Sequence, residues 1–403
     1  MSYLEKLLDG VEIKWKPLAH NEYGIAELCR GRVMSKEYLI ENAGEYPVYS
    51  SQTANNGEIG RIKSFDFDGE TVTWTTDGAN AGTVFHRTGK FSITNVCGLI
   101  KIKDTKVLNY KFLFYWLSIE AKKHVYSGMG NPKLMSHQME KIPIPIPPLS
   151  VQKKIVSILD TFTELTAELT AELTARKKQY NYYREQLLNF DIATKGMKNT
   201  KEVEWKTLGE IFDLKNGYTP SKSNQEYWED GTIPWFRMED IRENGRVLDK
   251  SIQYVNTCAV KGDKLFPANS IIVATSATIG EHALITVPFL SNQRFTNLSL
   301  KSEYENKFII KYLFYYGFVL DEWCKNNVTI GNFAGVDMNG FKKFQIPMPP
   351  LAKQARIVTI LDKFDTLTTS MSEGLPKEIE LRKKQYEYYR DLLLTFPKDK
   401  LNT

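Results

Sequence analysis

The spacing of apolar residues follows the same order of patterns in each half of the chain. Residues 3–148 and residues 200–348 contain short apolar runs with a period near two, separated by turn signals such as Asn55-Asn56-Gly57. That pattern is typical of short β-strands. One apolar stretch in each region, residues 111–118 and residues 308–318, favours a buried helix instead. We therefore predict two mixed α/β domains.

Each of these regions is followed by a segment in which the period lengthens to about 3.5 residues. Apolar and aromatic side chains recur every three or four residues from Ile155 to Phe190, and again from Leu375 to Phe396. This spacing places them on one face of a helix and forms a seam like that of a coiled coil. The simplest partner for each seam is the other copy.

The first of these helices is expected to be long and the second to be interrupted. A helix over residues 150–190 would extend for about 60 Å and act as a rigid spacer. In the second segment, Gly374 and Pro376 fall inside the periodic pattern. Proline removes a backbone donor and clashes with the preceding turn, so we predict a break or kink near residues 372–376.

An internal duplication accounts for the matching patterns. The sequence IPIPPLSVQKKIVSILDTF at residues 144–162 returns as IPMPPLAKQARIVTILDKF at residues 346–364, with twelve identities. The sequence RKKQYNYYREQLLNF at residues 176–190 returns as RKKQYEYYRDLLLTF at residues 382–396. A chain with two copies of one surface most simply engages a partner that presents two sites.

The two halves share a scaffold but differ in what lies between its ends. Each half opens alike, with Glu12-Ile13-Lys14-Trp15-Lys16 answered by Glu202-Val203-Glu204-Trp205-Lys206, and each domain closes on Pro-Pro-Leu. Between these points residue identity largely disappears, as expected of two recognition domains that share a scaffold and recognise different targets. We predict four segments in the chain: a domain over residues 1–148, a helix over residues 149–199, a domain over residues 200–348 and a helix over residues 349–403.

Composition narrows the class of protein further. A hydrophobic fraction of 42% is enough for globular cores, and a net charge of +5 mildly favours a polyanionic partner. The four cysteines lie far apart without CxxC spacing, so neither a zinc site nor a disulfide framework is indicated. The sequence contains no basic-then-apolar leader and no apolar run long enough to cross a bilayer. These features predict a reduced, cytoplasmic protein without membrane association.

Motifs that carry catalysis are missing from the sequence. There is no GxxxxGK[ST] phosphate loop, no GxGxxG after a strand, no HExxH and no GxSxG. Asn131-Pro132-Lys133 lacks the second proline and the aromatic residue with which an adenine methyltransferase grips a flipped base. The five histidines form no i,i+4 pair. We predict neither a catalytic centre nor a metal site in this chain.

The loops of both domains instead mix hydrogen-bonding and basic side chains with aromatics. Polar loops occur in any globular domain, but Arg, Asn and Gln can bond two atoms of one base edge, while Lys, Ser and Thr commonly hold phosphates. Given the duplicated architecture, we select nineteen candidate DNA-binding residues. They are Tyr49, Ser51, Gln52, Asn55, Asn56, Arg61, Lys63, Thr76, Asn80 and Arg87 in the first domain, and Tyr218, Lys222, Arg237, Arg242, Arg246, Ser276, Asn292, Gln293 and Arg294 in the second.

Two repeated motifs carry a resemblance to a known family. The pattern Pro-Pro-Leu-x-x-Gln-x-x-Ile begins at Pro147 and again at Pro349, each time closing a variable domain and opening a long helix. It resembles the specificity subunit of type I restriction-modification enzymes, over essentially the whole chain. That family often has Glu before the glutamine, where Val151 and Lys353 stand here. The tandem Thr-Ala-Glu-Leu at residues 166–173 is similar to the type IC branch.

This resemblance implies a function that composition and periodicity could not supply. Two target-recognition domains with twisted mixed sheets would be related by pseudo-twofold symmetry and held in inverted orientation by an antiparallel coiled coil. They would read a split, non-palindromic target in double-stranded DNA. Two modification subunits would bind S-adenosylmethionine and methylate adenine, and two restriction subunits would use ATP and Mg²⁺. The chain itself would bind no cofactor. The repeated segments at residues 176–184 and 382–390 would pair the helices and dock the modification subunits.

Two other classes of protein remain open from the sequence. In a structural or interaction protein the coiled coil would be the function, and sequence-selective DNA binding would be absent. A nuclease or methyltransferase would need the motifs that are missing above. Selection of binding sites from random duplexes would separate these classes.

Overall fold

The computed structural model describes residues 13–128, 130–190, 203–329, 334–370 and 372–397. Within these residues the chain forms two compact units. Unit 1 is drawn from Met1–Glu168 and Glu380–Thr403, and unit 2 is Leu169–Ile379. The repeated openings begin at Glu12 and Glu202, which lie outside the described residues, as does the predicted boundary at residues 199–200.

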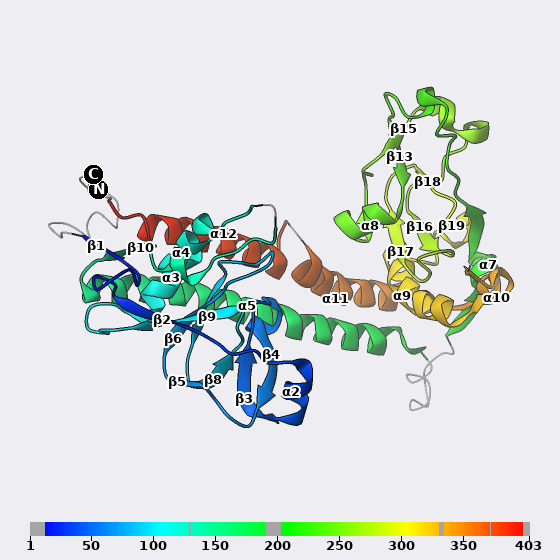
Figure 1. Ribbon diagram of the computed structural model, residues 1–403. Helices are drawn as coiled ribbons and strands as arrows, with labels where there is room; N and C mark the ends of the chain where they lie inside the picture. Colours follow the sequence, from blue (N-terminus) through cyan, green and yellow to red (C-terminus); the bar gives the residue numbers. More distant parts are fainter. Residues whose placement is uncertain (1–12, 129, 191–202, 330–333, 371, 398–403) are drawn as a thin grey trace, which may run out of the picture. The chain divides into compact units, whose positions relative to one another are not determined.

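Unit 1 contains two four-stranded sheets, seen in Figure 1. Trp74 on one sheet and Phe112 and Leu113 on helix α3 (Tyr110–Glu120) are fully buried in one core. The first sheet is antiparallel, in the order β2 (Ala26–Arg30), β9 (Cys97–Ile102), β6 (Thr71–Thr75) and β7 (Val84–Arg87). The second is mixed because β3 and β8 are parallel, in the order β4 (Glu58–Ile62), β3 (Ala43–Tyr49), β8 (Lys90–Ile93) and β5 (Phe67–Asp68).

Unit 2 repeats this plan with a larger main sheet. Its core includes the fully buried Tyr312 and Tyr315 of helix α9 (Ile310–Asn326). The main sheet has the order β12 (Phe212–Asn216), β19 (Phe295–Leu300), β16 (Ser270–Ala274), β17 (His282–Ile285) and β14 (Val247–Leu248). A three-stranded sheet has the order β15 (Tyr254–Val255), β13 (Ile233–Phe236) and β18 (Leu290–Ser291). The mixed α/β fold that the sequence predicts is confirmed in both units.

Shorter elements complete each unit. In unit 1 they are the pair β1 (Lys14–Pro17) with β10 (Pro143–Ile146), the helices α2 (Lys36–Glu41) and α4 (Ser136–Met139), and the 3₁₀ turns η1 (Ala54–Gly57) and η2 (Ala121–His124). In unit 2 they are the pairs β11 (Glu204–Thr207) with β22 (Gln345–Met348) and β20 (Val328–Thr329) with β21 (Gly335–Val336), the helices α7 (Leu208–Ile211), α8 (Met238–Asn244) and α10 (Met338–Lys343), and the 3₁₀ turns η3 (Gln225–Tyr227), η4 (Thr257–Ala259), η5 (Lys261–Asp263) and η6 (Ser302–Tyr304).

The long helices have the predicted form. Helix α5 (Leu149–Leu188) is continuous over 40 residues. The second copy is divided into α11 (Leu351–Thr369) and α12 (Leu375–Leu393). Gly374 has a φ of +89°, in the left-handed region where a side chain is strained, and Pro376 falls in the first turn of α12, where an N–H is not needed. The predicted break near residues 372–376 is confirmed.

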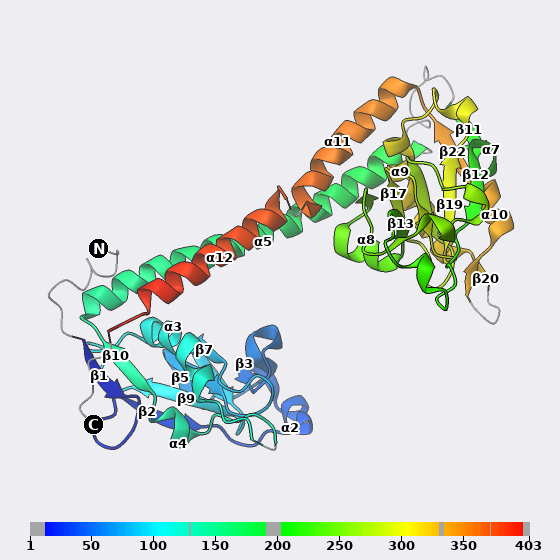
Figure 2. The same cartoon turned by 90° about the horizontal axis from the view of Figure 1, so that it is seen from above.

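Each seam pairs helices from the two repeats. In unit 1, Phe162 of α5 stacks on Tyr389 of α12 with 5.3 Å between ring centroids. In unit 2, Tyr183 of α5 stacks on Phe364 of α11 at 5.6 Å. Figures 1 and 2 show α12 (red) beside the first half of α5 and α11 (orange) beside its second half. The coiled-coil-like seam is therefore made by the two copies, as predicted.

The repeats also exchange their last aromatic residue. Phe396, from the end of the second repeat, packs on Phe112 and Trp116 of unit 1, each at 6.0 Å between ring centroids. Phe190, from the end of the first repeat, lies 6.4 Å from the ring of Tyr312 in unit 2. Each unit is consequently assembled from parts of both repeats.

A buried glutamine ties each domain to its long helix. Gln152 Oε1 accepts from Asn109 N at 2.9 Å, and its Nε2 donates to Val107 O and Pro147 O, both at 2.8 Å. Gln354 makes the same three bonds in unit 2, at 2.9 Å to Ile309 N, 2.9 Å to Lys307 O and 2.8 Å to Pro349 O. Both glutamines are 0% exposed. The glutamine of the repeated motif is therefore a structural clamp.

Replacing this clamp should destabilise the unit that contains it. Gln152→Ala leaves the buried Pro147 O and the part-buried Asn109 N and Val107 O without this partner, so we expect the free energy of unfolding to fall by about 2–4 kcal/mol. Urea unfolding followed by tryptophan fluorescence measures the change. Lys153→Ala, at the exposed neighbouring position, is the matched control and should cost less than ~0.5 kcal/mol. A loss of that small size in Gln152→Ala would contradict the assignment.

Candidate nucleic-acid interface

Three connections that follow equivalent strands meet in each unit. In unit 1 the segments after β2, β3 and β8 come together: Thr94 N donates to Tyr49 O at 2.9 Å and Asn95 N donates to Arg32 O at 3.1 Å. In unit 2 the segments after β12, β13 and β18 do the same, because Tyr218 N donates to Ser291 O at 2.8 Å and Asn292 N to Phe236 O at 3.1 Å. The scaffold thus brings three loops together twice.

A glycine at the same place permits the crossing in each unit. A Cβ on Gly31 would lie 2.0 Å from Ile93 O, and a Cβ on Gly217 would lie 2.3 Å from Ser291 O. Neither distance is possible for a real side chain, so any other residue would push the loops apart. The residues that follow these glycines differ between the units, whereas the backbone crossing beneath them is the same.

The loop after β3 presents amide side chains. Asn55, Asn56 and Gly57 have φ values of +49°, +54° and +82°, three left-handed residues in succession. Asn tolerates this conformation better than other side-chain-bearing residues. The turn closes where Ser50 N donates to Gly57 O at 3.0 Å. Gln52, Asn55 and Asn56 are exposed, and they are three of the predicted residues.

The other predicted residues in unit 1 differ in how exposed their side chains are. Arg61 is exposed and paired with Glu58 at 2.8 Å, and Lys63 and Asn80 are exposed. Tyr49 and Ser51 are half-buried. Thr76 and Arg87 are buried, at 0% and 3% exposure. The structure therefore places Thr76 and Arg87 beneath the loops, where they cannot touch DNA without a change in their surroundings.

Several predicted residues of unit 2 gather at its three loops. Trp235 Nε1 donates to Tyr218 O at 3.0 Å, and the Tyr218 hydroxyl donates to Ala259 O at 3.1 Å. Thr219 donates to the side chain of Gln293. Half-buried Asn292 and exposed Lys222, Gln293 and Arg294 belong to this group, as does Arg237, whose guanidinium lies 5.4 Å from the ring centroid of Trp235.

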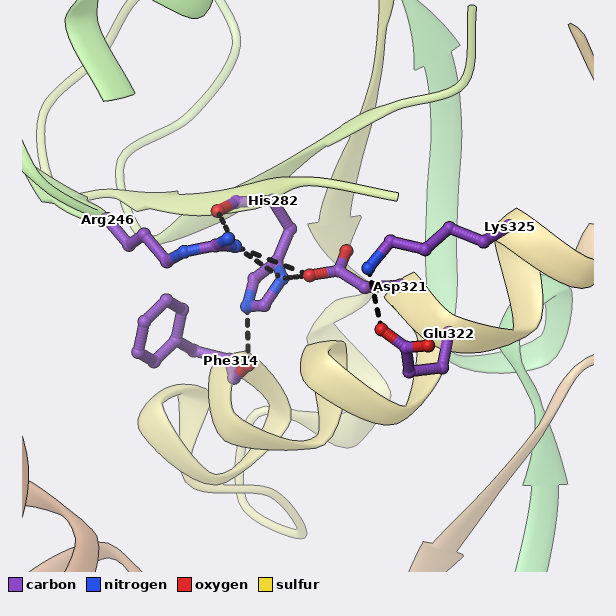
Figure 3. Close-up of polar contacts among 6 residues, drawn as sticks. All are labelled: Arg246, His282, Phe314, Asp321, Glu322 and Lys325. Carbon is purple, nitrogen blue, oxygen red and sulfur yellow. Dashed lines mark hydrogen bonds and ion pairs between the residues drawn. The ribbon is translucent and has the colours of Figure 1, made fainter. Parts of the chain in front are cut away.

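Arg246 instead is half-buried and belongs to a polar cluster with His282 of β17 and Asp321 of α9, drawn in Figure 3. Its Nη1 donates to His282 O at 3.1 Å and lies 3.3 Å from Asp321 Oδ2. His282 is 0% exposed; its Nδ1 lies 2.7 Å from Asp321 Oδ2, and its Nε2 lies 2.9 Å from Phe314 O. Arg246 Nη1 also lies 3.4 Å from His282 Nδ1, so both ring nitrogens have polar partners within the unit. This cluster joins β17 to α9 and gives Arg246 a structural partner.

The remaining predicted residues of unit 2 are Arg242 and Ser276. Arg242 is exposed on α8, and Ser276 is half-buried and forms an isolated bridge with Gly335. No hydrogen bond among the described residues joins either side chain to the three-loop group.

Sequence reasoning missed the segment after β2. Arg32 donates to the Tyr38 hydroxyl at 3.0 Å and to Asp66 Oδ2 at 3.1 Å, and these bonds, the one to Tyr38 most, raise the pKa of Arg32. Exposed Arg30 reaches Thr76 Oγ1 at 3.4 Å. A signal was available, because Gly31-Arg32-Val33-Met34-Ser35-Lys36 and Gly217-Tyr218-Thr219-Pro220-Ser221-Lys222 share the spacing Gly-x-x-x-Ser-Lys.

Metal binding, membrane insertion and thiol chemistry find little support among the described residues. They contain no group of three or more His, Cys, Asp or Glu side chains arranged to hold a metal ion. No helix among them is long and apolar enough to cross a membrane. Burial raises the pKa of the Cys97 thiol to about 12, which keeps this side chain protonated.

Comparison with known proteins identifies the class that this fold and these loops define. The family model of the type I restriction modification DNA specificity domain matches twice, at residues 21–176 and 200–381. The chain belongs to this family. It is therefore the DNA-specificity subunit, a non-catalytic member, of a type I restriction-modification system.

Individual relatives agree with this assignment. The chain is 40% identical to the type I restriction enzyme EcoR124I/EcoR124II specificity subunit of Escherichia coli, over 99% of this chain and 98% of that protein. It is 59% identical to the EcoprrI specificity subunit of E. coli over 50% of this chain, a match that spans 52% of that protein. The crystal structure of the S subunit from M. genitalium has the same fold, with a TM-score of 0.57 at 17% identity over 99% of this chain and 100% of that one.

Proposed function

We propose that each set of three loops reads one half of a bipartite, non-palindromic target in double-stranded DNA. The observation that carries this proposal is the pairing of a duplicated scaffold with loops of different sequence. The same three strand connections meet in both units, and the same crossing glycine supports them. One partner read by two such surfaces must present two different sequences. We call each of these sequences a half-site.

The exposed loop residues have the chemistry that base and phosphate contacts require. Gln52, Asn55 and Asn56 in unit 1 and Gln293 and Arg294 in unit 2 are exposed and can bond base edges in the major groove. Arg61, Lys63 and Lys222 are exposed cations suited to phosphates. Thr76 and Arg87 are buried in unit 1, and Arg246 has partners on β17 and α9 of unit 2.

Selection of duplexes from a random library tests this proposal. The complex of the chain with its modification subunit should enrich two short sequences separated by a gap of fixed length and any composition. Enrichment of one continuous sequence, or of none, would contradict it.

The chemistry of modification and restriction falls to partner subunits in this proposal. Two modification subunits would supply S-adenosylmethionine and adenine methylation, two restriction subunits would supply ATP-driven translocation and cleavage with Mg²⁺, and the assembly would act in the cytoplasm, where the DNA is. A partner present in two identical copies needs two identical docking surfaces. The base-reading loops differ between the units, so docking belongs on surfaces that the repeats share.

One exposed surface is duplicated without being needed for packing. Lys177, Lys178 and Tyr182 on α5 return as Lys383, Lys384 and Tyr388 on α12, and all six are exposed. Tyr182 is 59% exposed and Tyr388 is 65% exposed. Their rings rest edge-on against Tyr183 and Tyr389 at 5.5 and 5.4 Å. An aromatic side chain kept in solvent in both copies favours a protein partner.

Removing these rings should weaken assembly with the modification subunit. We expect the double variant Tyr182→Ser, Tyr388→Ser to bind it at least tenfold more weakly, and Tyr182→Ser alone to weaken one of two sites, because each ring belongs to a separate unit. Native mass spectrometry counts the bound subunits. Asn181→Ser with Glu387→Ser alters the adjacent exposed positions, which differ between the repeats, and is the matched control. Full assembly of the tyrosine double variant would exclude this surface.

A further inference from the structure

Arg87 occupies the space between the two sheets of unit 1. It ends β7 of the first sheet, where its Nε donates to Thr73 Oγ1 of β6 at 3.3 Å. Its Nη2 donates to Asn56 O, in the turn between β3 and β4 of the second sheet, at 2.7 Å. Its Cζ lies 3.6 Å from the ring centroid of Tyr49 on β3. One guanidinium thus connects the first sheet to the loop that the second sheet presents.

The turn that Arg87 contacts is strained. Left-handed backbone at the two non-glycine residues Asn55 and Asn56 has a conformational cost, which the surrounding structure must offset. Asn56 O points inward to the buried cation, while the side chains of Asn55 and Asn56 remain exposed. Gly57 completes the fit, since a Cβ there would lie 3.1 Å from Arg87 Nη2. The contact to Arg87 therefore fixes which way the amide side chains face.

The shape of the guanidinium matters as much as its charge. Its face lies against aromatic rings, with Cζ 3.6 Å from the Tyr49 centroid and 4.4 Å from that of Phe85, while nitrogens at its edge donate to Thr73 and Asn56. A lysine ammonium is a point charge and cannot do both. Nη1 is buried and has no hydrogen-bond partner among the described residues.

This arrangement is specific to unit 1. In unit 2 the strand equivalent to β7 is β17, and it ends at Ile285, which is fully buried in an apolar core. An aliphatic side chain cannot donate to a loop carbonyl. A residue present in one unit and absent from the other can affect one half-site without the other.

We propose that Arg87 is a positioning residue for base selection in the half-site read by unit 1. It acts through the turn at residues 55–57 and does not touch DNA. This inference rests on the proposed function. It differs from the sequence prediction, in which Arg87 contacts DNA itself.

The test compares both half-sites in one selection. In complexes containing Arg87→Lys or Arg87→Gln, base preference at one half-site should fall at least tenfold, while the other half-site keeps its preference as an internal control. His86→Gln, on the same strand but paired with Glu70 at 2.7 Å, is the matched control and should leave both half-sites unchanged. Amide hydrogen exchange without DNA should become faster at residues 50–57 in Arg87→Lys.

Gly57→Ala disturbs the same contact by a change in the loop, because the added Cβ would crowd Arg87 Nη2. This variant keeps the proposal falsifiable if the Arg87 variants fold poorly. It should reproduce the loss at the same single half-site. Unchanged base selection in Arg87→Gln would overturn this inference and leave the proposed function standing. The same holds if the Arg87 variants lose base preference at both half-sites while Gly57→Ala selects normally. A wild-type complex that selects no sequence would overturn the proposed function, and this inference with it.

Discussion

Exchanging residues 12–145 for the equivalent region of a related specificity subunit will change one half-site completely and leave the other as it was. All three loops of unit 1 lie inside this region, and all three loops of unit 2 lie outside it. The junctions are close together in space, because Lys14 pairs with Ile146 across β1 and β10. The Gln152 clamp and α5 remain with the recipient chain. We therefore expect the graft to fold.

The readout is a map of methylated adenines across a large DNA. Exchange of residues 202–347, whose ends are joined by the pairing of β11 with β22, is the reciprocal control and should change only the other half-site. If either exchange altered both half-sites, base reading would be shared between the units, and the modular account would be wrong.

Inserting one Thr-Ala-Glu-Leu unit after Leu173 will lengthen the gap between half-sites and preserve both of their sequences. The existing tandem lies within α5, where the hydroxyls of Thr166 and Thr174 donate to Phe162 O at 2.8 Å and Thr170 O at 3.0 Å without interrupting the helix. Four more residues add about 6 Å of helix and rotate it by about 40° beyond a full turn. At about 3.4 Å per base pair, the gap should grow by one or two base pairs.

Methylation of the original target should fall to background in this variant, because the spacing no longer fits. A matched insertion of four alanines separates the effect of length from that of sequence, since it adds the same rise, and it should lengthen the gap equally. An unchanged gap, or altered half-site bases at a fixed gap, would show that the tandem does not set the distance between the half-sites.

Patterns within short stretches of sequence predicted the helices and their interruption well. The three-and-four spacing from Ile155 to Phe190 required only the geometry of one helix and a partner with the same spacing. Gly374 and Pro376 act through their own backbones, so the break they cause did not depend on distant contacts. The duplication added the partner, because each repeat supplies one side of the seam.

Candidate site residues were harder to predict because their exposure depends on residues far away in the sequence. Arg87 was selected as a basic loop residue, yet Tyr49 and Asn56 from the other sheet enclose it. Arg246 was selected for the same reason, and Asp321, 75 positions away, holds it on α9. The segment after Gly31 was missed because only its Gly, Ser and Lys recur in the segment that begins at Gly217. Base contacts by the other selected residues stay a prediction.

Site-specific photo-crosslinking tests the central claim most directly. Gln52 and Gln293 are exposed members of the two three-loop groups, and each can be replaced by a photoreactive phenylalanine analogue in the complex with the modification subunit. We predict that position 52 crosslinks to bases of one half-site only and that position 293 crosslinks to bases of the other only. Crosslinks from both positions to the same half-site, or from neither position to any half-site base, would contradict it.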